Sequence, residues 1–136
     1  FSMTGQRRDL NREKFKLDNL LSVLNNPESN ANKNLKYLRN AMNVRSKLKQ
    51  FHPCSEMKCL SKGRSDIVVI KRSKGLESVF AIHNMTENKI NYQLNDNDLP
   101  KIIDNDFNTH DFLTSTKYNW KNISLDPFQV IWLSAL

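Results

Sequence analysis

Residues 67–84 read IVVIKRSKGLESVFAIHN, and this stretch decides the fold. It places two β-branched or aromatic runs, Ile67–Ile70 and Val79–Ile82, on either side of the turn signal Lys74-Gly75. Short runs of this kind, separated by a glycine-containing turn, are typical of antiparallel strands. Ile67–Ile70 is apolar at every position, so we expect both faces of that strand to be covered.

The same pattern continues on the C-terminal side. Ile90–Leu94 and Phe128–Leu133 are further β-rich runs, and no helical pattern separates them. This arrangement predicts antiparallel sheets packed as a small sandwich. Residues 99–123 are poorly patterned, and we expect a loop there with one or two weak strands. The intervening turn signals are Lys62-Gly63-Arg64, Thr86-Glu87-Asn88 and Asp126-Pro127.

The N-terminal side has helical periodicity instead. Four leucines from Leu17 to Leu24 recur at helical spacing, and Pro27 ends that pattern. Ser29 or Asn30 is expected to cap a longer helix, which ends at Phe51-His52-Pro53. Its apolar arc is wide enough to pack on something large. The chain is therefore predicted to be α+β, with helices first and antiparallel strands second.

The charge of the chain is concentrated in its helical part. The net charge is +7 over 136 residues; residues 1–50 hold eleven Lys and Arg against four acids, and residues 51–136 hold ten of each. A basic region suggests nucleic acid or phosphate as a partner. The basic side chains, however, are on helices that also have a wide apolar face, so nucleic-acid binding is the minor interpretation.

Nothing in the sequence predicts a membrane protein or a disulfide framework. No apolar run approaches the ~20 residues of a membrane span. Two cysteines, Cys54 and Cys59, are too few to staple a chain of this size. We therefore expect a reducing, cytoplasmic location. Phe1 at the start of the chain suggests a fragment or a processed product.

We expect no metal and no cofactor. Cys54 and Cys59, with His52 nearby, are spaced more loosely than zinc-ribbon ligands, and no second pair follows. The run from Asp104 resembles a calcium loop, but Thr109 stands where the loop needs glycine, and the closing glutamate is missing. Phosphate-cradling glycine-rich loops and the G-x-S-x-G elbow are absent from the sequence.

No catalytic residue is predicted within the chain. Asp104, Asp106 and Asp111 share one polar loop, where nothing in the sequence indicates burial or a raised pKa. Paired carboxylates for glycoside chemistry must flank the bond that is cut. We therefore assign these three aspartates no catalytic role.

The opening loop, TGQRRDLNREKF at residues 4–15, is the candidate binding segment. It places Arg7 and Arg8 after a glycine. The guanidinium group presents a rigid fork of donors that suits oxygen-rich ligands. A charged helix entry capped by Asp9 or Asn11 is the structural alternative.

Four islands of sequence together resemble the C-terminal part of sucrose-phosphorylase-type enzymes of the α-amylase superfamily, glycoside hydrolase family thirteen. They occur in the order found in that family and span nearly the whole chain. Each is weak alone, and the ordered set is fairly specific. The islands are Gly5–Arg12 (GQRRDLNR), Val44 to Pro53, Val79–Asn84 (VFAIHN) and Leu125–Leu133 (LDPFQVIWL).

The resemblance implies a division into two parts. Residues 1–51 would be the last active-site loop and terminal helices of a (β/α)8 barrel, and residues 52–136 a small antiparallel β-domain. In the family, the arginine before Asp-Ile-Asn-Arg reaches the glucosyl unit at the cleaved bond, a role that transfers to Arg8. Arg7 and Asp9 are its neighbours, for which less is implied.

The implied reaction is retaining glucosyl transfer from sucrose or a related α-glucoside to phosphate. The implied partners are this α-glucoside, inorganic phosphate and the missing barrel. Its catalytic acids would lie on barrel strands outside this chain, so the isolated chain is expected to be inactive. Leu48-Lys49-Gln50 and Phe128 depart from the family pattern. Those departures leave the identity of the sugar substrate open.

Two alternative functions remain from the sequence. One is a free-standing basic module that binds nucleic acid, which a strongly salt-dependent affinity would support. The other is a carbohydrate-binding module, which exposure of Trp120 and Trp132 would favour. A truncated barrel should also leave the apolar faces of residues 17–48 partly exposed.

Overall fold

The computed structural model describes residues 16–61, 63–98 and 107–135. The chain divides into two compact units, residues 1–40 and residues 41–136.

The helical part contains α1 (Leu17–Asn25) and α2 (Asn30–Lys47). Ser29 caps α2 as predicted, because its Oγ accepts a hydrogen bond from the backbone N–H of Asn32 at 3.0 Å. The Asn32 side chain then donates through Nδ2 to the carbonyl oxygen of Leu24 at 2.5 Å. This bond ties the end of α1 to the start of α2.

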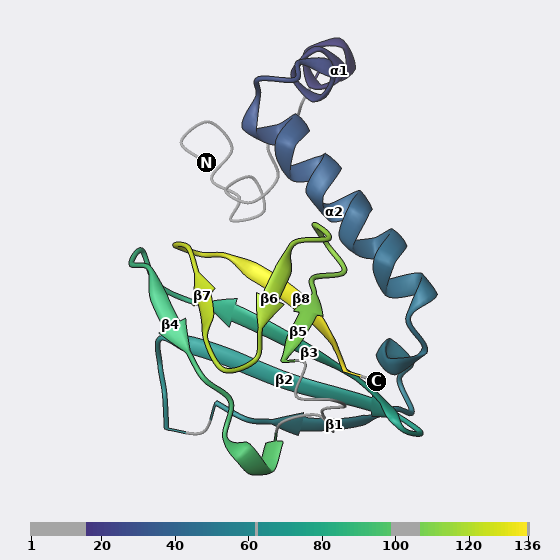
Figure 1. Cartoon of the computed structure of the whole chain (residues 1–136). Coiled ribbons are helices and arrows are strands. Elements are labelled where there is room, and N and C mark those ends of the chain that lie inside the picture. The colour runs from purple at the N-terminus through teal and green to yellow at the C-terminus, as the bar shows by residue number, and fades with distance from the viewer. Residues whose placement is uncertain (1–15, 62, 99–106, 136) are drawn as a thin grey trace, which may run out of the picture. The chain divides into compact units, whose positions relative to one another are not determined.

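The β-part is built on a four-stranded antiparallel sheet in the order β1-β2-β3-β8 (Figure 1). Its strands are β1 (Glu56–Cys59), β2 (Ile67–Lys74), β3 (Glu77–Asn84) and β8 (Val130–Ala135). The predicted strand pair forms a hairpin whose turn places Gly75 at a φ of 64°, a left-handed conformation that glycine adopts easily. The sequence pattern did not reveal β1, whose four residues are all exposed.

The shorter strands form two pairs. β4 (Ile90–Tyr92) pairs with β7 (Ile123–Leu125), and β5 (Asn108–His110) pairs with β6 (Lys117–Asn119). A short 3-10 turn, η3 (Asp96–Asp98), follows β4. β5 and β6 agree with the prediction of one or two weak strands in the poorly patterned region.

The core lies between the four-stranded sheet and the β4–β7 pair. Alternate residues of the sheet point to this side, and burying apolar side chains is the main favourable term in folding. The fully buried members from the sheet are Ile67, Val69, Phe80, Ile82, Ile131 and Leu133, and they meet Tyr92, Leu94, Trp120, Ile123 and Leu125. The structure thus confirms the predicted α+β class, with two packed β-layers after the helices.

The outer face of the sheet is only half covered. A 3-10 turn, η2 (Lys49–Phe51), follows α2 and packs there, with the Phe51 and Trp132 ring centroids 4.7 Å apart. Val68 and Ile70 on this face stay half-exposed. The expectation that Ile67–Ile70 is covered on both faces therefore holds for the core side alone.

The helices keep apolar side chains in solvent, as expected for residues 17–48. α1 has no buried residue, and its apolar side chains Leu17, Leu21 and Val23 are all exposed. On α2, Leu38 and Met42 are exposed, Met42 by 69%. Within the described residues, this stripe of α2 has no apolar layer against it.

Candidate functional site

The opening loop lies outside the described residues. The roles predicted for Arg7, Arg8 and Asp9 therefore remain predictions. The described part of the chain contains a different candidate, a hollow in the β-unit, which we call the η2 hollow.

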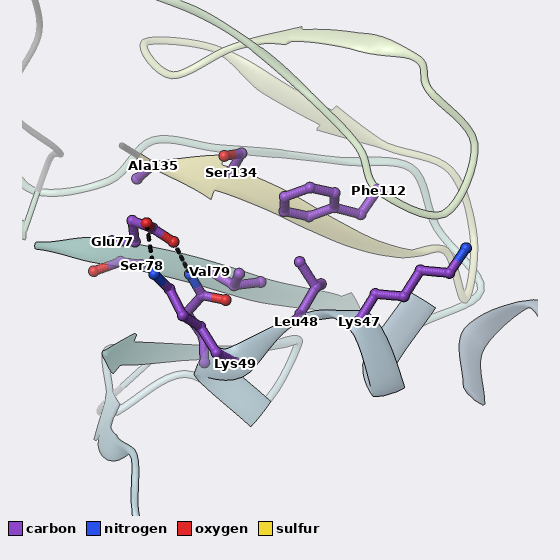
Figure 2. A pocket seen from close by; sticks show the side chains of 10 residues that line it. Lys47, Leu48, Lys49, Glu77, Ser78, Val79, Phe112, Ser134 and Ala135 are labelled. Carbon is purple, nitrogen blue, oxygen red and sulfur yellow. Dashed lines mark hydrogen bonds and ion pairs between the residues drawn. The ribbon is translucent and has the colours of Figure 1, made fainter. Parts of the chain in front are cut away.

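The η2 hollow lies where η2 crosses the start of β3 and the end of β8 (Figure 2). Its volume is about 190 Å³. The lining combines apolar and polar side chains, with the Phe112 ring on one side and the Glu77 carboxylate on the other (Figure 2). The lining residues are Lys47, Leu48, Lys49, Gln50, Glu77, Ser78, Val79, Phe112, Ser134 and Ala135.

Glu77 forms the polar wall of this hollow. Its Oε1 accepts a hydrogen bond from Lys49 Nζ at 2.8 Å, and its Oε2 accepts one from Gln50 Nε2 at 2.8 Å. The hydrogen bond from Lys49 is the largest influence on the Glu77 carboxyl and holds its pKa below the usual range. Gln50 is only 5% exposed, so η2 anchors this wall from a buried position.

A second contact fixes η2 on the sheet. Arg72 of β2 donates from Nε to the carbonyl oxygen of Gln50 at 3.2 Å and from Nη2 to that of His52 at 2.7 Å. Ser55 adds a hydrogen bond from its hydroxyl to the carbonyl oxygen of Lys49 at 3.0 Å. The frame of the hollow is therefore made by β2, β3 and the turn that follows α2.

Asp111 has an unexpected environment. It is 1% exposed, although nothing in the sequence indicated that it would be buried. Its Oδ1 accepts from the backbone N–H groups of Trp132 at 2.8 Å and Leu113 at 3.1 Å, and its Oδ2 accepts from the Thr114 hydroxyl at 2.7 Å. The carboxylate satisfies the Trp132 N–H at the edge of β8, beside the isolated bridge between Asp111 and Leu133, so burial here serves structure. Asp104 and Asp106 lie outside the described residues.

The two tryptophans do not form a sugar-stacking surface. Trp120 is 2% exposed in the core, with its ring centroid 4.9 Å from that of Phe80. Trp132 is half-buried under Phe51. Both observations count against the carbohydrate-binding module that their exposure would have favoured.

The remaining candidate motifs have structural explanations. Asn84, part of one family-like island, is buried and forms four hydrogen bonds through its side chain, to Thr86 N and Oγ1 and to the carbonyl oxygens of Asn88 and Asp126. Cys54 and Cys59 are both exposed, and the Cys59 sulfur lies 3.5 Å from the Ser61 hydroxyl oxygen. Among the described residues, no three His, Cys, Asp or Glu side chains gather where they could hold a metal. No helix in the described ranges has the length and apolar character needed to cross a bilayer.

The η2 hollow is suited to binding a ligand and not to cleaving a glycosidic bond. Among the described residues that line it, Glu77 is the one carboxylate, whereas glycoside chemistry requires a pair. The sequence analysis missed this hollow because it brings together residues 47–50, 77–79, 112 and 134–135. Only the departure from the family pattern at Leu48-Lys49-Gln50 marked the region as unusual.

Comparison with known proteins gives a fold. No family model matches the sequence, and no curated protein matches it. Among solved structures, trehalose-6-phosphate hydrolase of Bacillus licheniformis matches 85% of this chain and 20% of its own, at 16% identity and a TM-score of 0.62. A MutB mutant from crystals soaked with trehalulose matches 85% of this chain and 19% of its own, at 12% identity and a TM-score of 0.63.

An Anoxybacillus α-amylase also matches, over 80% of this chain and 23% of its own, at 15% identity and a TM-score of 0.60. The chain spans about a fifth of the length of each of these enzymes. It therefore shares its fold, two helices followed by antiparallel β-sheets, with the C-terminal part of α-amylase-family enzymes.

Proposed function

We propose that this chain is the C-terminal part of an α-amylase-superfamily enzyme that acts on α-glucosides. The observation that carries this proposal is the extent of the fold match. The match to trehalose-6-phosphate hydrolase covers 85% of the 136 residues. A β-domain at 52–136 has only 85 of those residues, so the match must also include part of the helical region. A related MutB mutant is described in complex with glucose, consistent with sugar chemistry in enzymes of this fold.

The family-like islands support a narrower proposal. They favour a sucrose-phosphorylase-type enzyme, in which phosphate attacks a glucosyl-enzyme and releases glucose 1-phosphate. Residues 1–51 would supply the last active-site loop and terminal helices of the barrel, and residues 52–136 the supporting β-domain. Arg8 would contact the glucosyl unit, since active sites of such barrels lie on loops at the C-terminal ends of the strands. The catalytic acids would come from the rest of the barrel.

The exposed helix faces support the same proposal. Leu38 and Met42 on α2, and most of the apolar side chains of α1, are in solvent within the described chain. A barrel helix normally buries such a stripe against its strands and neighbouring helices. The missing barrel is therefore the partner we propose for these faces, in a cytoplasmic enzyme.

The test is an activity assay on the full reading frame that contains this chain. With sucrose and phosphate, the proposal expects glucose 1-phosphate as the product, and Arg8→Ala should lower kcat/KM by about 100-fold or more, near 2.7 kcal/mol. Arg39→Ala removes an exposed arginine from α2 and serves as the matched control, with unchanged activity expected. Release of free glucose alone would reject phosphorolysis and would support hydrolysis of the α-glucoside by an α-amylase-superfamily enzyme. No activity on any α-glucoside would reject both.

A further inference from the structure

The η2 hollow has the two kinds of wall that a sugar ring requires. Its floor and one side are apolar, formed by Leu48, Val79 and the Phe112 ring (Figure 2). Its other side is polar, formed by Glu77 with Lys49 and Gln50. Small-molecule sites typically combine an apolar lining with a few precisely placed polar groups.

The hydrogen-bonding capacity of Glu77 is only partly used. An ionised carboxylate has about four acceptor positions. Lys49 and Gln50 occupy one on each oxygen. No other described residue donates to this carboxylate, so about two positions remain for donors from a ligand. Hydroxyl groups can donate to them, whereas an inorganic anion at this wall would have to compete with Glu77 for Lys49.

The volume limits the size of the ligand. About 190 Å³ equals the share of roughly six waters at ~30 Å³ each. A single six-membered sugar ring fits this space, and a disaccharide would have to extend beyond it. Lys47 lines the rim beside Phe112, and its amino group points away from Glu77 (Figure 2).

We propose that the η2 hollow binds a single neutral pyranose, with one ring face on Phe112 and hydroxyls on Glu77. The choice of a sugar rests on the proposed function, whereas the shape and the polar wall rest on the described residues. The site is a binding site, and no bond is made or broken in it.

The test is a titration of the whole 136-residue chain with glucose and methyl α-glucoside, followed by backbone NMR shifts. Binding is expected with a Kd near 1 mM to 10 mM, typical of one small ligand in a shallow site, with the largest shifts at Glu77–Val79 and Ser134. Phe112→Ala should weaken binding about tenfold. Glu77→Gln, at a partly exposed position outside the core, replaces the charged acceptor by a neutral amide and should weaken binding about threefold.

Phe128→Ala is the matched control. It removes another phenyl ring, in the turn before β8, whereas Ser134 lies near the far end of that strand. Equal loss of affinity in Phe112→Ala and Phe128→Ala would overturn the proposal, as would the absence of shifts at 100 mM sugar. Inorganic phosphate that shifts the same residues and is not displaced by glucose would overturn it in favour of an anion site. Because the titration needs no catalysis, its failure leaves the assay of the full reading frame unaffected.

Discussion

Replacing Asp111 by alanine should destabilise the β-unit severely. The carboxylate is 1% exposed and accepts hydrogen bonds from two backbone N–H groups, those of Leu113 and Trp132. Alanine leaves both donors buried at the edge of β8 without an acceptor. Each unsatisfied buried donor costs about 1–3 kcal/mol. The Thr114 hydroxyl can turn to water, since Thr114 is exposed, so it adds little.

We therefore expect a loss of about 4 kcal/mol for Asp111→Ala. Small domains have a free energy of unfolding of about 5–15 kcal/mol, so this loss is a large fraction of the total. Asp111→Asn keeps an oxygen acceptor for the two N–H groups and loses mainly the charge-assisted part, an expected cost of about 1–2 kcal/mol. Urea unfolding followed by tryptophan fluorescence measures both, because Trp120 is buried in the core.

The matched control is Asp126→Ala. The Asp126 side chain is exposed and pairs with Lys89 at 3.3 Å, an interaction worth about 0–1 kcal/mol. Its loss should shift the midpoint little. If Asp111→Ala costs no more than Asp126→Ala, the buried acceptor is not what holds the edge of β8. If the asparagine variant is as damaged as the alanine variant, the charge matters and the acceptor geometry does not.

Three further predictions concern pH and association. Since Lys49 lowers the Glu77 pKa, Glu77 stabilises the fold above its unfolded value of about 4.5, and this contribution is lost as pH falls through the lowered folded value. Urea midpoints of wild type and Glu77→Gln should therefore differ at neutral pH and converge in acid. Burial lowers the His83 pKa from 6.5, so the unfolded chain takes up the proton first, and stability should decline as pH falls below 6.5. His83→Gln should show a flatter pH profile of urea midpoints there, and an unchanged profile would contradict this. Finally, Leu38→Lys with Met42→Lys should reduce self-association several-fold by analytical ultracentrifugation, because both side chains are exposed and apolar. Equal association of wild type and variant would place the contact elsewhere.

The sequence predicted those parts of the fold where local pattern and tertiary environment agree. Ile67–Ile70 and Val79–Ile82 are β-rich, flank a glycine turn and pair in the expected hairpin. The start of α2 followed from Ser29, whose hydroxyl oxygen can accept a bond from the first helical turn. These signals are local, so they can be read without knowing what packs against them.

The sequence did not predict features that depend on distant partners. β1 has no apolar alternation, because all four of its residues are exposed, and it pairs at the edge of the sheet with β2. Asp111 stands in a polar loop, and its burial depends on Trp132, which is 21 residues away. The η2 hollow likewise depends on four separate segments. In each case the contact has a long sequence separation and leaves no periodic signature.

Burial differs between the helical part and the β-part of the chain, and this difference helps to choose between an enzyme fragment and a free-standing nucleic-acid module. Among the described residues of the β-part, eight core side chains have no exposed surface, and the buried side chains of Asp111 and Asn84 are hydrogen-bonded. α1, with nine residues and no buried side chain, has no comparable support. Isolated helices of that length are marginal in water, because most helical stability in proteins comes from packing an apolar face. A free-standing nucleic-acid module would have little reason to keep Leu17, Leu21 and Val23 apolar, since phosphate binding requires only the basic side chains. The pattern is what a helix taken from a larger packed layer would show, and this is why we favour the enzyme fragment.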